Sequence, residues 1–595
     1  MNFTDYKNDT KEVATKIAYT WHEWDSARSK AKKLWQEIDS YIHSTDTTSI
    51  EGGNNFTHTV MIPVVSEIHE DLQAIMYSTI FPHTDWLGWK PFDRDSATVT
   101  KREKVLNYLK HIHLLNGFYK TNRTLIDDLI RYGNSFVEVH PVDERESKED
   151  GSYSAGYVGA KPKRISPYDI VFNPTASSFD KTDKIVRSLV HVSDLLDWYS
   201  GVVPDGDLDA LRRTLASRKD KISTSTTSAY TGKDKQYVPD GFGTFQEYIT
   251  SGYVEVLSFY GDVFDETSFK SKKNRMICVI DGDTVIVDEP LDGKRIFKGS
   301  WKPRPDNLWS QGALDSVIGL NYMINHRENS KNEAIDKFIY PDRLYQGDVE
   351  EVYDEVTGQM KYLAPENGAV VDMQPNTAIL SYNNEVASHL ELARRAARLP
   401  QQLTGFRSAG EKTAFEVQAL NDGAFRGFIN KAEQYEQDLL EPLVTAELDI
   451  ARTNFESVVQ VAKRTPEGLT EFLEVNEEDL KSNGKLLPYG SRRFSRLLQQ
   501  QAGLNQLSQS QLGQVIAPHL STWKLAEVVE HVYGFEDFDM FEKFVSIEEQ
   551  LEAQEMQAMA QNEFAQSQSQ PTAQELALQQ EEEELLMQAE QEGGL

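Results

Sequence analysis

Trp301-Lys-Pro-Arg-Pro-Asp-Asn-Leu-Trp-Ser-Gln-Gly312 opens the stretch of sequence that decides the fold of this chain. The pattern from Gln311 to Ile339 predicts a helix, which has to end before Pro341 because proline disfavours a helical conformation in the residue that precedes it. Short strand-like runs follow from about Tyr340 to Leu380, and Ser388 to Leu399 predicts a second helix. The sequence therefore predicts a helix that leads out, a small β-rich lobe, and a helix that leads back.

A glycine-containing loop and one long helix follow this pair. The segment Thr404-Gly-Phe-Arg-Ser-Ala-Gly-Glu-Lys-Thr-Ala-Phe-Glu416 contains two Ser/Thr-x-x-Glu pairs, and either pair can form a capping box at the start of a helix. We expect this helix to run to about Val459. Pro442 lies inside it, removes one backbone hydrogen bond and is expected to bend it. A short strand is expected near Glu471 to Val475.

The helix predicted after Gln311 has a mixed face. Its apolar residues share that face with asparagines and charged side chains; these apolar residues are Leu314, Val317, Ile324, Ile335 and Phe338. A helix that packs only against the core of its own chain would show a cleaner apolar stripe. We therefore expect this helix to pack sideways against copies of itself, with one side in water.

The residues before Trp301 predict a mixture of helices and strands. Helices are expected over about 5–42, 64–81, 97–115 and 119–132, and strands over about 135–140, 163–174 and 253–260. The first helix is expected to bury one stripe formed by Trp21, Trp24, Ala31, Trp35 and Ile38. The most specific signal is Met276 to Val287, where Asp281-Gly282 separates two β-branched runs and predicts a hairpin. The expected fold class is α+β, predominantly helical.

Composition limits the function classes. The chain has 595 residues, a formal net charge of −32 and a single cysteine, so an intrachain disulfide is excluded. Proteins that grip nucleic acid are usually basic, and this chain therefore either never meets DNA or meets it where adhesion would be harmful; the simplest explanation of the acidity is solubility. No apolar run approaches the roughly 20 residues of a membrane span, and no signal peptide is evident. We expect synthesis in the cytoplasm and no membrane contact.

Motifs for catalysis and metal binding are missing from the sequence. It contains no phosphate-binding loop of the Gly-x-x-x-x-Gly-Lys-Ser/Thr type and no Gly-x-Ser-x-Gly nucleophile motif. His111 and His113 are two apart, so on a helix they point in different directions and cannot easily hold one metal ion. Cys278 lies in an apolar strand and is expected to be a buried structural residue. We expect no enzymatic activity, no cofactor and no metal.

Positive charge gathers near the predicted loop, which is unusual in an acidic chain. The residues are Arg394, Arg395, Arg398, Arg407 and Lys412. One interpretation is that they form salt bridges with neighbouring acids. The other is that they make weak, salt-dependent contacts with the phosphates of DNA passing through a channel.

Several patches, taken in order, resemble the portal proteins of tailed bacteriophages, of the short-tailed type. Ile165-Ser-Pro-Tyr-Asp-Ile-Val-Phe-Asn-Pro174 is similar to a segment of the portal wing. The hairpin from Val279 to Val287 precedes Pro303-Arg-Pro-Asp-Asn-Leu-Trp-Ser-Gln-Gly312, as in that family, and the residues from Asp315 to Asn325 resemble the start of its first stem helix. Glu411-Lys-Thr-Ala-Phe-Glu-Val417 resembles a patch at the tunnel loop, with Lys412 where arginine is common.

The resemblance implies a portal fold of wing, stem, clip and crown in a closed ring of twelve copies around a DNA channel at one capsid vertex. It divides the chain into a wing region (1–312), an outgoing stem helix (313–340), a clip (341–385), a returning stem helix (386–400), a tunnel loop (401–412), a long kinked wing helix (413–475), a crown (476–547) and an acidic Glu/Gln-rich tail (548–595) that is partly disordered or forms a helical bundle. The implied partners are double-stranded DNA, the terminase packaging motor, tail adaptor proteins, and the major capsid or scaffolding protein. The implied location is the virion.

Two other interpretations stay open at this point. The chain can be a different virion ring protein such as a tail adaptor, although adaptors are usually shorter and lack the helix pair with its lobe. It can also be a hydrolase of a kind that the motifs do not reveal. Rings with a central hole would favour the portal interpretation, and a compact monomer would count against it.

Overall fold

The computed structural model describes residues 1–491 with gaps, of which the longest are 44–59, 93–98, 146–155, most of 197–244, 364–368, 374–381 and 400–426. The described residues all belong to one compact unit, Met1–Ser495. Its structure is mixed α+β, about half helical, with several antiparallel sheets. The expected α+β class is confirmed, although the sheets are more extensive than a predominantly helical fold implies. Most of the predicted crown and the whole predicted acidic tail lie outside the described residues.

The N-terminal segment forms two helices, α1 (Thr10–Ala27) and α2 (Ser29–Ile42), so the prediction of one continuous helix is wrong. The break lies at Arg28, whose buried guanidinium bonds the carbonyls of Pro167 and Tyr168, each at 2.5 Å. Both carbonyls lie between the strands 158–165 and 170–172, inside the segment that was predicted as one strand. The residues of the predicted apolar stripe therefore pack in three separate hydrophobic cores. The tryptophans of the stripe pack in two of these cores, and Ile38 packs in the third.

Three helices that the sequence predicts are confirmed: α3 (Val64–Ile80), α4 (Val99–Leu115) and α5 (Phe118–Tyr132). Gly117 and Gly133 flank α5 with φ angles of 73° and 72°, in the left-handed region that glycine adopts without a steric penalty. The apolar faces of α3, α4 and α5 form the largest core, which also takes in residues near 313–324 and 428–451. The N-terminal helices and the predicted wing helix therefore share one interior.

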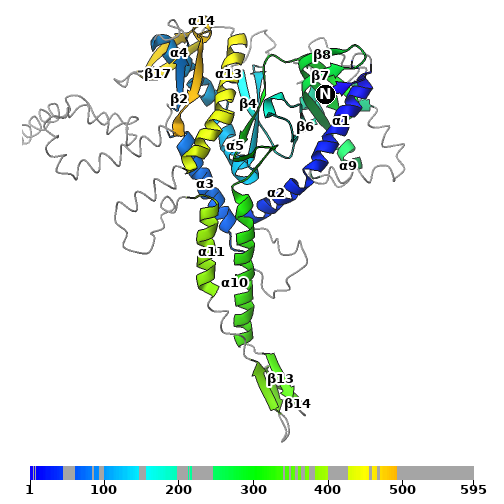
Figure 1. The fold of residues 1–595 in the computed structure, drawn as a ribbon, viewed down its shortest axis with the longest axis vertical. Helices are drawn as coiled ribbons and strands as arrows, with labels where there is room; N and C mark the ends of the chain where they lie inside the picture. Colours follow the sequence, from blue (N-terminus) through cyan, green and yellow to red (C-terminus); the bar gives the residue numbers. More distant parts are fainter. Residues whose placement is uncertain are drawn as a thin grey trace, which may run out of the picture. The chain divides into compact units, whose positions relative to one another are not determined.

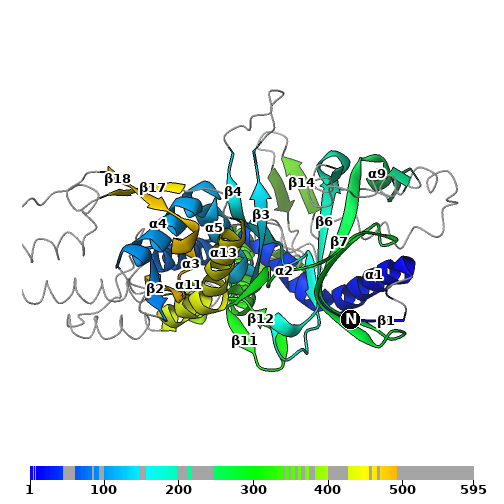
Figure 2. The same cartoon turned by 90° about the horizontal axis from the view of Figure 1, so that it is seen from above.

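Two antiparallel sheets lie beside these helices. The larger has the strand order β5 (Ile170–Phe172), β6 (Lys184–His191), β7 (Tyr253–Asp265), β8 (Lys270–Ile280) and β9 (Thr284–Pro290), with β1 (Asn2–Phe3) parallel to β7. The smaller has the order β10 (Ile296–Ser300), β3 (Asn134–Asp143) and β4 (Val158–Ile165). Helix α1 packs on the larger sheet and buries Ile17 and Trp21 against it (Figure 2).

The hairpin predicted at 276–287 is confirmed. Strands β8 and β9 pair antiparallel, and Asp281 and Gly282 between them have φ angles of 49° and 68°. A type I′ β-turn requires a positive φ at both of its central residues, and the pair Asp-Gly adopts this conformation at low cost. Cys278 on β8 is 1% exposed, as predicted, and burial raises the pKa of its thiol to about 12.

Short elements complete the described structure. They are β2 (Leu87–Pro91) paired with β19 (Gly484–Pro488), β11 (Lys302–Arg304) with β12 (Asn307–Gln311), β17 (Val459–Arg464) with β18 (Thr470–Val475), and the helices α9 (Phe245–Thr250) and α14 (Glu477–Leu480). The strand predicted near 471–475 is thus confirmed, while its partner β17 lies where the long helix was predicted to end.

The long helix is described from residue 427 to Asn454, and residues 455–458 lie outside the described part. Its predicted interruption at Pro442 takes the form of a π-helical segment, Glu436–Leu440, directly before α13 (Glu441–Asn454). Proline has no N–H to donate, and the wider turn relieves the clash of its ring with the preceding turn. The same segment buries the carboxylate of Glu436, which accepts bonds from the amide and hydroxyl of Ser491, each at 2.7 Å.

Candidate functional site

Two helices form the out-and-back pair that the sequence predicts. They are α10 (Ile318–Ile339), preceded by a turn of 3-10 helix at Leu314–Ser316, and α11 (Tyr382–Ala396), which begins earlier than the predicted start at 386. The pair lies side by side in Figure 1. Arg327 in the middle of α10 pairs with Glu385 at the start of α11, and Arg394 near the end of α11 pairs with Glu67 on α3. The chain therefore leaves along α10 and returns antiparallel along α11.

Two nested hairpins join the far ends of the helices. The outer pair is β13 (Asp342–Gln346) with β16 (Ala369–Met373), and the inner pair is β14 (Glu350–Asp354) with β15 (Gln359–Leu363). All four strands pair antiparallel. The β-rich character predicted between the helices is thus confirmed.

A row of asparagines explains the mixed face of α10. Asn321, Asn325 and Asn329 are spaced by four, so they share one side of the helix, and all three are buried. Their side-chain oxygens accept hydrogen bonds from the backbone amides of Val65 (3.2 Å), Ile62 (2.9 Å) and Val60 (2.7 Å).

This asparagine ladder holds the segment 60–65, which leads into α3. The N-cap of α3 is Pro63, which has no side chain that could cap the helix, and Asn321 on α10 supplies an acceptor for the Val65 amide in the first turn instead. The side-chain oxygens of these three asparagines thus have partners within the same chain. The expectation that α10 packs sideways against copies of itself stays a prediction.

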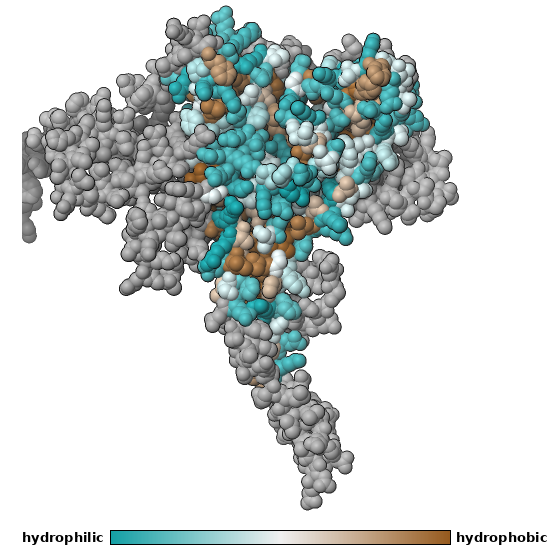
Figure 3. Space-filling model, in the orientation of Figure 1, coloured by the Kyte–Doolittle hydropathy of each residue, from teal (hydrophilic) through white to brown (hydrophobic). Residues whose placement is uncertain are grey.

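Other positions on the helix pair expose large apolar side chains. Those that are at least one third exposed are Tyr322, Met323, Ile335 and Ile339 on α10 and Leu392 on α11. Apolar residues gather over the upper part of α10 in the view of Figure 3. They stand on more than one side of α10, a pattern typical of a helix that is contacted from several directions.

The three predicted cations that the structure describes have different surroundings. Arg394 pairs with Glu67 at 2.6 Å, and Arg395 pairs with Glu391 one turn earlier on α11. The salt-bridge interpretation therefore holds for these two arginines. Arg407 and Lys412 lie outside the described residues.

Arg398 is different, because it stands with cations that the sequence did not single out. It is exposed, has a φ of 60° and makes no ion pair within the described residues. Its guanidinium lies 3.8 Å from the position of a Cβ placed on Gly427, at the described start of the long helix. Lys431, one turn further, and Lys302, next to Trp301, carry the neighbouring positive charges. Because these three cations are far apart in the sequence, no sequence pattern indicated that they lie near one another.

Polar residues buried in the largest core have structural partners. Nε2 of His113 lies 2.9 Å from Glu447, which also accepts a bond from Asn116 at 3.1 Å. The contact with Glu447 joins α4 to α13, and His113 also stacks on Phe118 of α5 with 3.9 Å between ring centroids. Within the described ranges, no group of three or more His, Cys, Asp or Glu side chains is placed to hold a metal ion. None of the helices described is both long and apolar enough to cross a bilayer.

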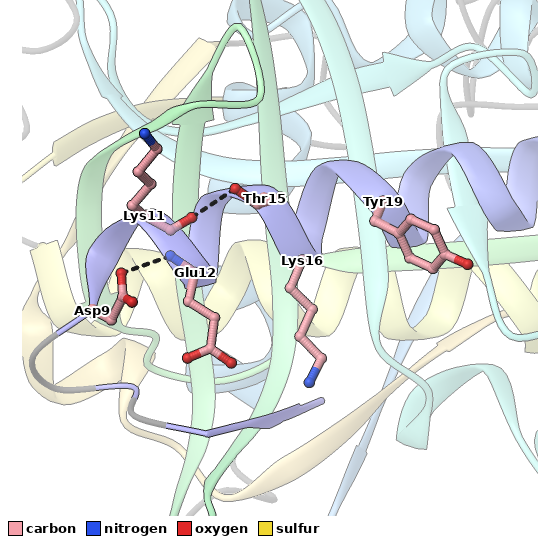
Figure 4. Close-up of a pocket in the computed structure, with 6 residues that line it drawn as sticks. All are labelled: Asp9, Lys11, Glu12, Thr15, Lys16 and Tyr19. Atoms are coloured by element: carbon pink, nitrogen blue, oxygen red, sulfur yellow. Dashed lines mark hydrogen bonds between the residues drawn. The ribbon is translucent and has the colours of Figure 1, made fainter.

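A hollow of about 490 Å³ lies on the outer face of α1 (Figure 4). It is lined by residues that carry polar or charged groups, among them Asp9, Glu12 and Thr15, although much of the lining surface is apolar. Asp9 accepts a hydrogen bond from the Glu12 amide at 2.9 Å, and Thr15 donates to the carbonyl of Lys11 at 2.9 Å, so two of its polar groups stabilise the helix itself. An N-cap and a side-chain bond within the helix account for these two contacts without a ligand.

No protein-family model matches this sequence, and no curated protein is significantly similar to it. The geometry of the helix pair and its surroundings therefore carries the functional argument.

Proposed function

We propose that this chain is a portal protein, the subunit of a ring of twelve around a DNA channel at one vertex of a tailed-bacteriophage capsid. The observation that carries the proposal is the antiparallel pair α10 and α11 with nested hairpins joining its far ends. In this proposal α10 and α11 are the stem, the hairpins are the clip, and the sheets and remaining described helices form the wing.

The exposed apolar residues of the stem support assembly. Burying one Ile, Met or Leu side chain contributes about 1.5–3 kcal/mol, and the stem exposes several such side chains in each copy. A cyclic head-to-tail arrangement places one side of every stem against the opposite side of its neighbour. Such an arrangement covers apolar residues on more than one side of α10, which a twofold dimer would do for one side only.

The proposed role is mechanical rather than catalytic. Viral DNA would enter the capsid and leave it through the ring. The clip would contact the terminase packaging motor and the tail adaptor proteins, and the wing would contact the major capsid or scaffolding protein. The net charge of −32 suits a wall past which a polyanion slides without adhesion. The protein would act in the virion without a cofactor.

Sedimentation velocity tests the proposal. The wild-type protein should sediment as a large, uniform assembly. Replacing Tyr322 and Met323 by serine should shift it toward the monomer, while the control Phe269→Ser, which alters an 82% exposed ring in the turn between β7 and β8, should not. A wild-type monomer at micromolar concentration, or equal behaviour of the two variants, would refute the proposed stem interface.

A further inference from the structure

Most arginines in the described part of the chain have a carboxylate partner, as expected for an acidic protein. The paired ones are Arg28, Arg131, Arg145, Arg164, Arg187, Arg275, Arg327, Arg394, Arg395 and Arg452. Lys302, Arg398 and Lys431 make no ion pair within the described residues. They lie near one another, because Lys431 contacts the carbonyl of Trp301, the neighbour of Lys302, and the guanidinium of Arg398 lies beside Gly427, one turn before Lys431. Among the described residues, such a group without an acidic partner contrasts with the excess of 94 acidic over 62 basic residues in the chain.

Three separate segments bring these cations together. Lys302 begins β11, Arg398 follows the end of α11, and Lys431 lies in the first described turns of the long helix. Lys431 donates to the carbonyl of Trp301 at 2.5 Å, and its ammonium lies 5.9 Å from the centre of the Trp301 ring. Trp301 is 5% exposed, so it gives the cluster a rigid base.

The charges repel one another in the folded chain. The pKa of Lys431 is lowered, first by burial and then by the positive charges of Arg398 and Lys302. The negative charge of Asp438 acts in the opposite direction on Lys431 and offsets part of this repulsion. Asp438 and Asp315 both have a raised pKa, because burial disfavours their charged forms, and neither forms a salt bridge within the described residues. An arrangement that holds like charges together is stabilised when an anion binds among them.

We propose that Lys302, Arg398 and Lys431 form a binding site for a phosphate group. Two ammonium groups and one guanidinium offer N–H donors from three segments of the chain, and arginine can bind two phosphate oxygens at once. Lys302 and Arg398 are exposed and Lys431 is half-buried, so a ligand can approach from solvent. The site lies near the end of α11 and the described start of the long helix.

The phosphate can come from a polynucleotide backbone or from a free phosphate compound. Identifying the source as DNA rests on the proposed portal function, whereas the site itself does not. If the source is DNA, this site is a local point of contact in a chain that otherwise repels DNA.

The test compares the double variant Lys302→Gln/Arg398→Gln with the wild-type full-length chain. The control is Arg395→Gln/Lys294→Gln, which removes two exposed cations that pair with Glu391 and Asp180. Fluorescence anisotropy with a labelled DNA duplex is measured between about 50 and 200 mM salt, where each phosphate contact contributes about 0.9 to the slope of log affinity against log salt. Isothermal titration with inorganic pyrophosphate is the second arm.

We expect the slope of log affinity against log salt to be about 1.8 smaller in magnitude for the double variant than for the wild type. Between about 50 and 200 mM salt, the factor by which salt weakens DNA binding should then be about tenfold smaller for the double variant. The control variant should keep the wild-type slope. Binding of pyrophosphate but not of the duplex, with the same loss in the double variant, supports the site and assigns it to a free phosphate compound. Equal behaviour of all three proteins toward both probes, or no binding of either probe to the wild type, overturns the site. Sedimentation reports ring assembly separately, so the two proposals can fail independently.

Discussion

Removing one rung of the asparagine ladder should loosen the start of α3 and leave the rest of the protein intact. The change is Asn325→Ala. The Asn325 side chain is 5% exposed and accepts the Ile62 amide at 2.9 Å. Losing that acceptor leaves a partly buried N–H unsatisfied, which costs about 1–3 kcal/mol. Alanine has a higher helix propensity than asparagine, which offsets up to about 0.7 kcal/mol of that cost.

Asn332→Ala is the matched control for this substitution. Asn332 lies further along the same helix, is half-buried and makes no hydrogen bond within the described residues. It therefore carries the gain in helix propensity without the loss of a hydrogen bond. The two variants should differ by about 1–3 kcal/mol in the local stability of the segment 60–65, or about tenfold in its amide exchange rate for each 1.4 kcal/mol.

Native-state hydrogen exchange with mass spectrometry measures this difference directly. Peptides that cover residues 60–65 should exchange faster in Asn325→Ala than in Asn332→Ala, and peptides from β8 and β9 should exchange equally in both. Equal exchange of the 60–65 segment in the two variants would show that the ladder contributes nothing and that our explanation of the mixed face of α10 is wrong.

Three further predictions concern the interior. Burial lowers the pKa of Lys298 to about 8, against roughly 10.4 in the unfolded chain, so between these pH values the unfolded chain binds more protons. The free energy of unfolding should therefore rise from pH 8 to pH 10 more in the wild type than in Lys298→Met. Denaturant titrations that give the same change in the free energy of unfolding for both proteins would contradict this. Gly133→Ala should destabilise by more than about 1 kcal/mol in thermal melts, because φ is 72° and its Cβ would lie 2.3 Å from the carbonyl carbon of Gln311. The control Gly293→Ala, with φ of 81° and open space around it, should cost less. The thiol of Cys278 should resist Ellman's reagent until the protein unfolds, and rapid labelling of the native protein would show that β8 opens.

The sequence predicted those elements whose determinants are local. The turn at Asp281-Gly282 was predictable because both residues adopt positive φ without needing distant partners. The ends of α5 were predictable for the same reason, since Gly117 and Gly133 flank it. The pair α10 and α11 followed from proline positions and residue periodicity.

Features that depend on distant contacts were missed. The break at Arg28 depends on carbonyls more than a hundred residues away, so a stripe of tryptophans was taken for one helix. The partners of the asparagines on α10 could not be predicted, because nothing in the sequence shows that residues 60–65 lie beside them. The candidate site shows the same limit. Of the named cations that the structure describes, Arg398 alone joins the group with Lys302 and Lys431, and these companions come from segments that only folding brings close.

The central claim is that α10 and α11 pack side by side with the same helices of sister chains around an axial hole. Single-particle cryo-electron microscopy of the purified full-length protein tests it most directly. We predict a closed ring in which these two helices from every subunit line the central opening, with the hairpins 342–373 at one end of it. A monomer, or an assembly that places α10 and α11 on its outer surface away from the axis, would contradict the claim.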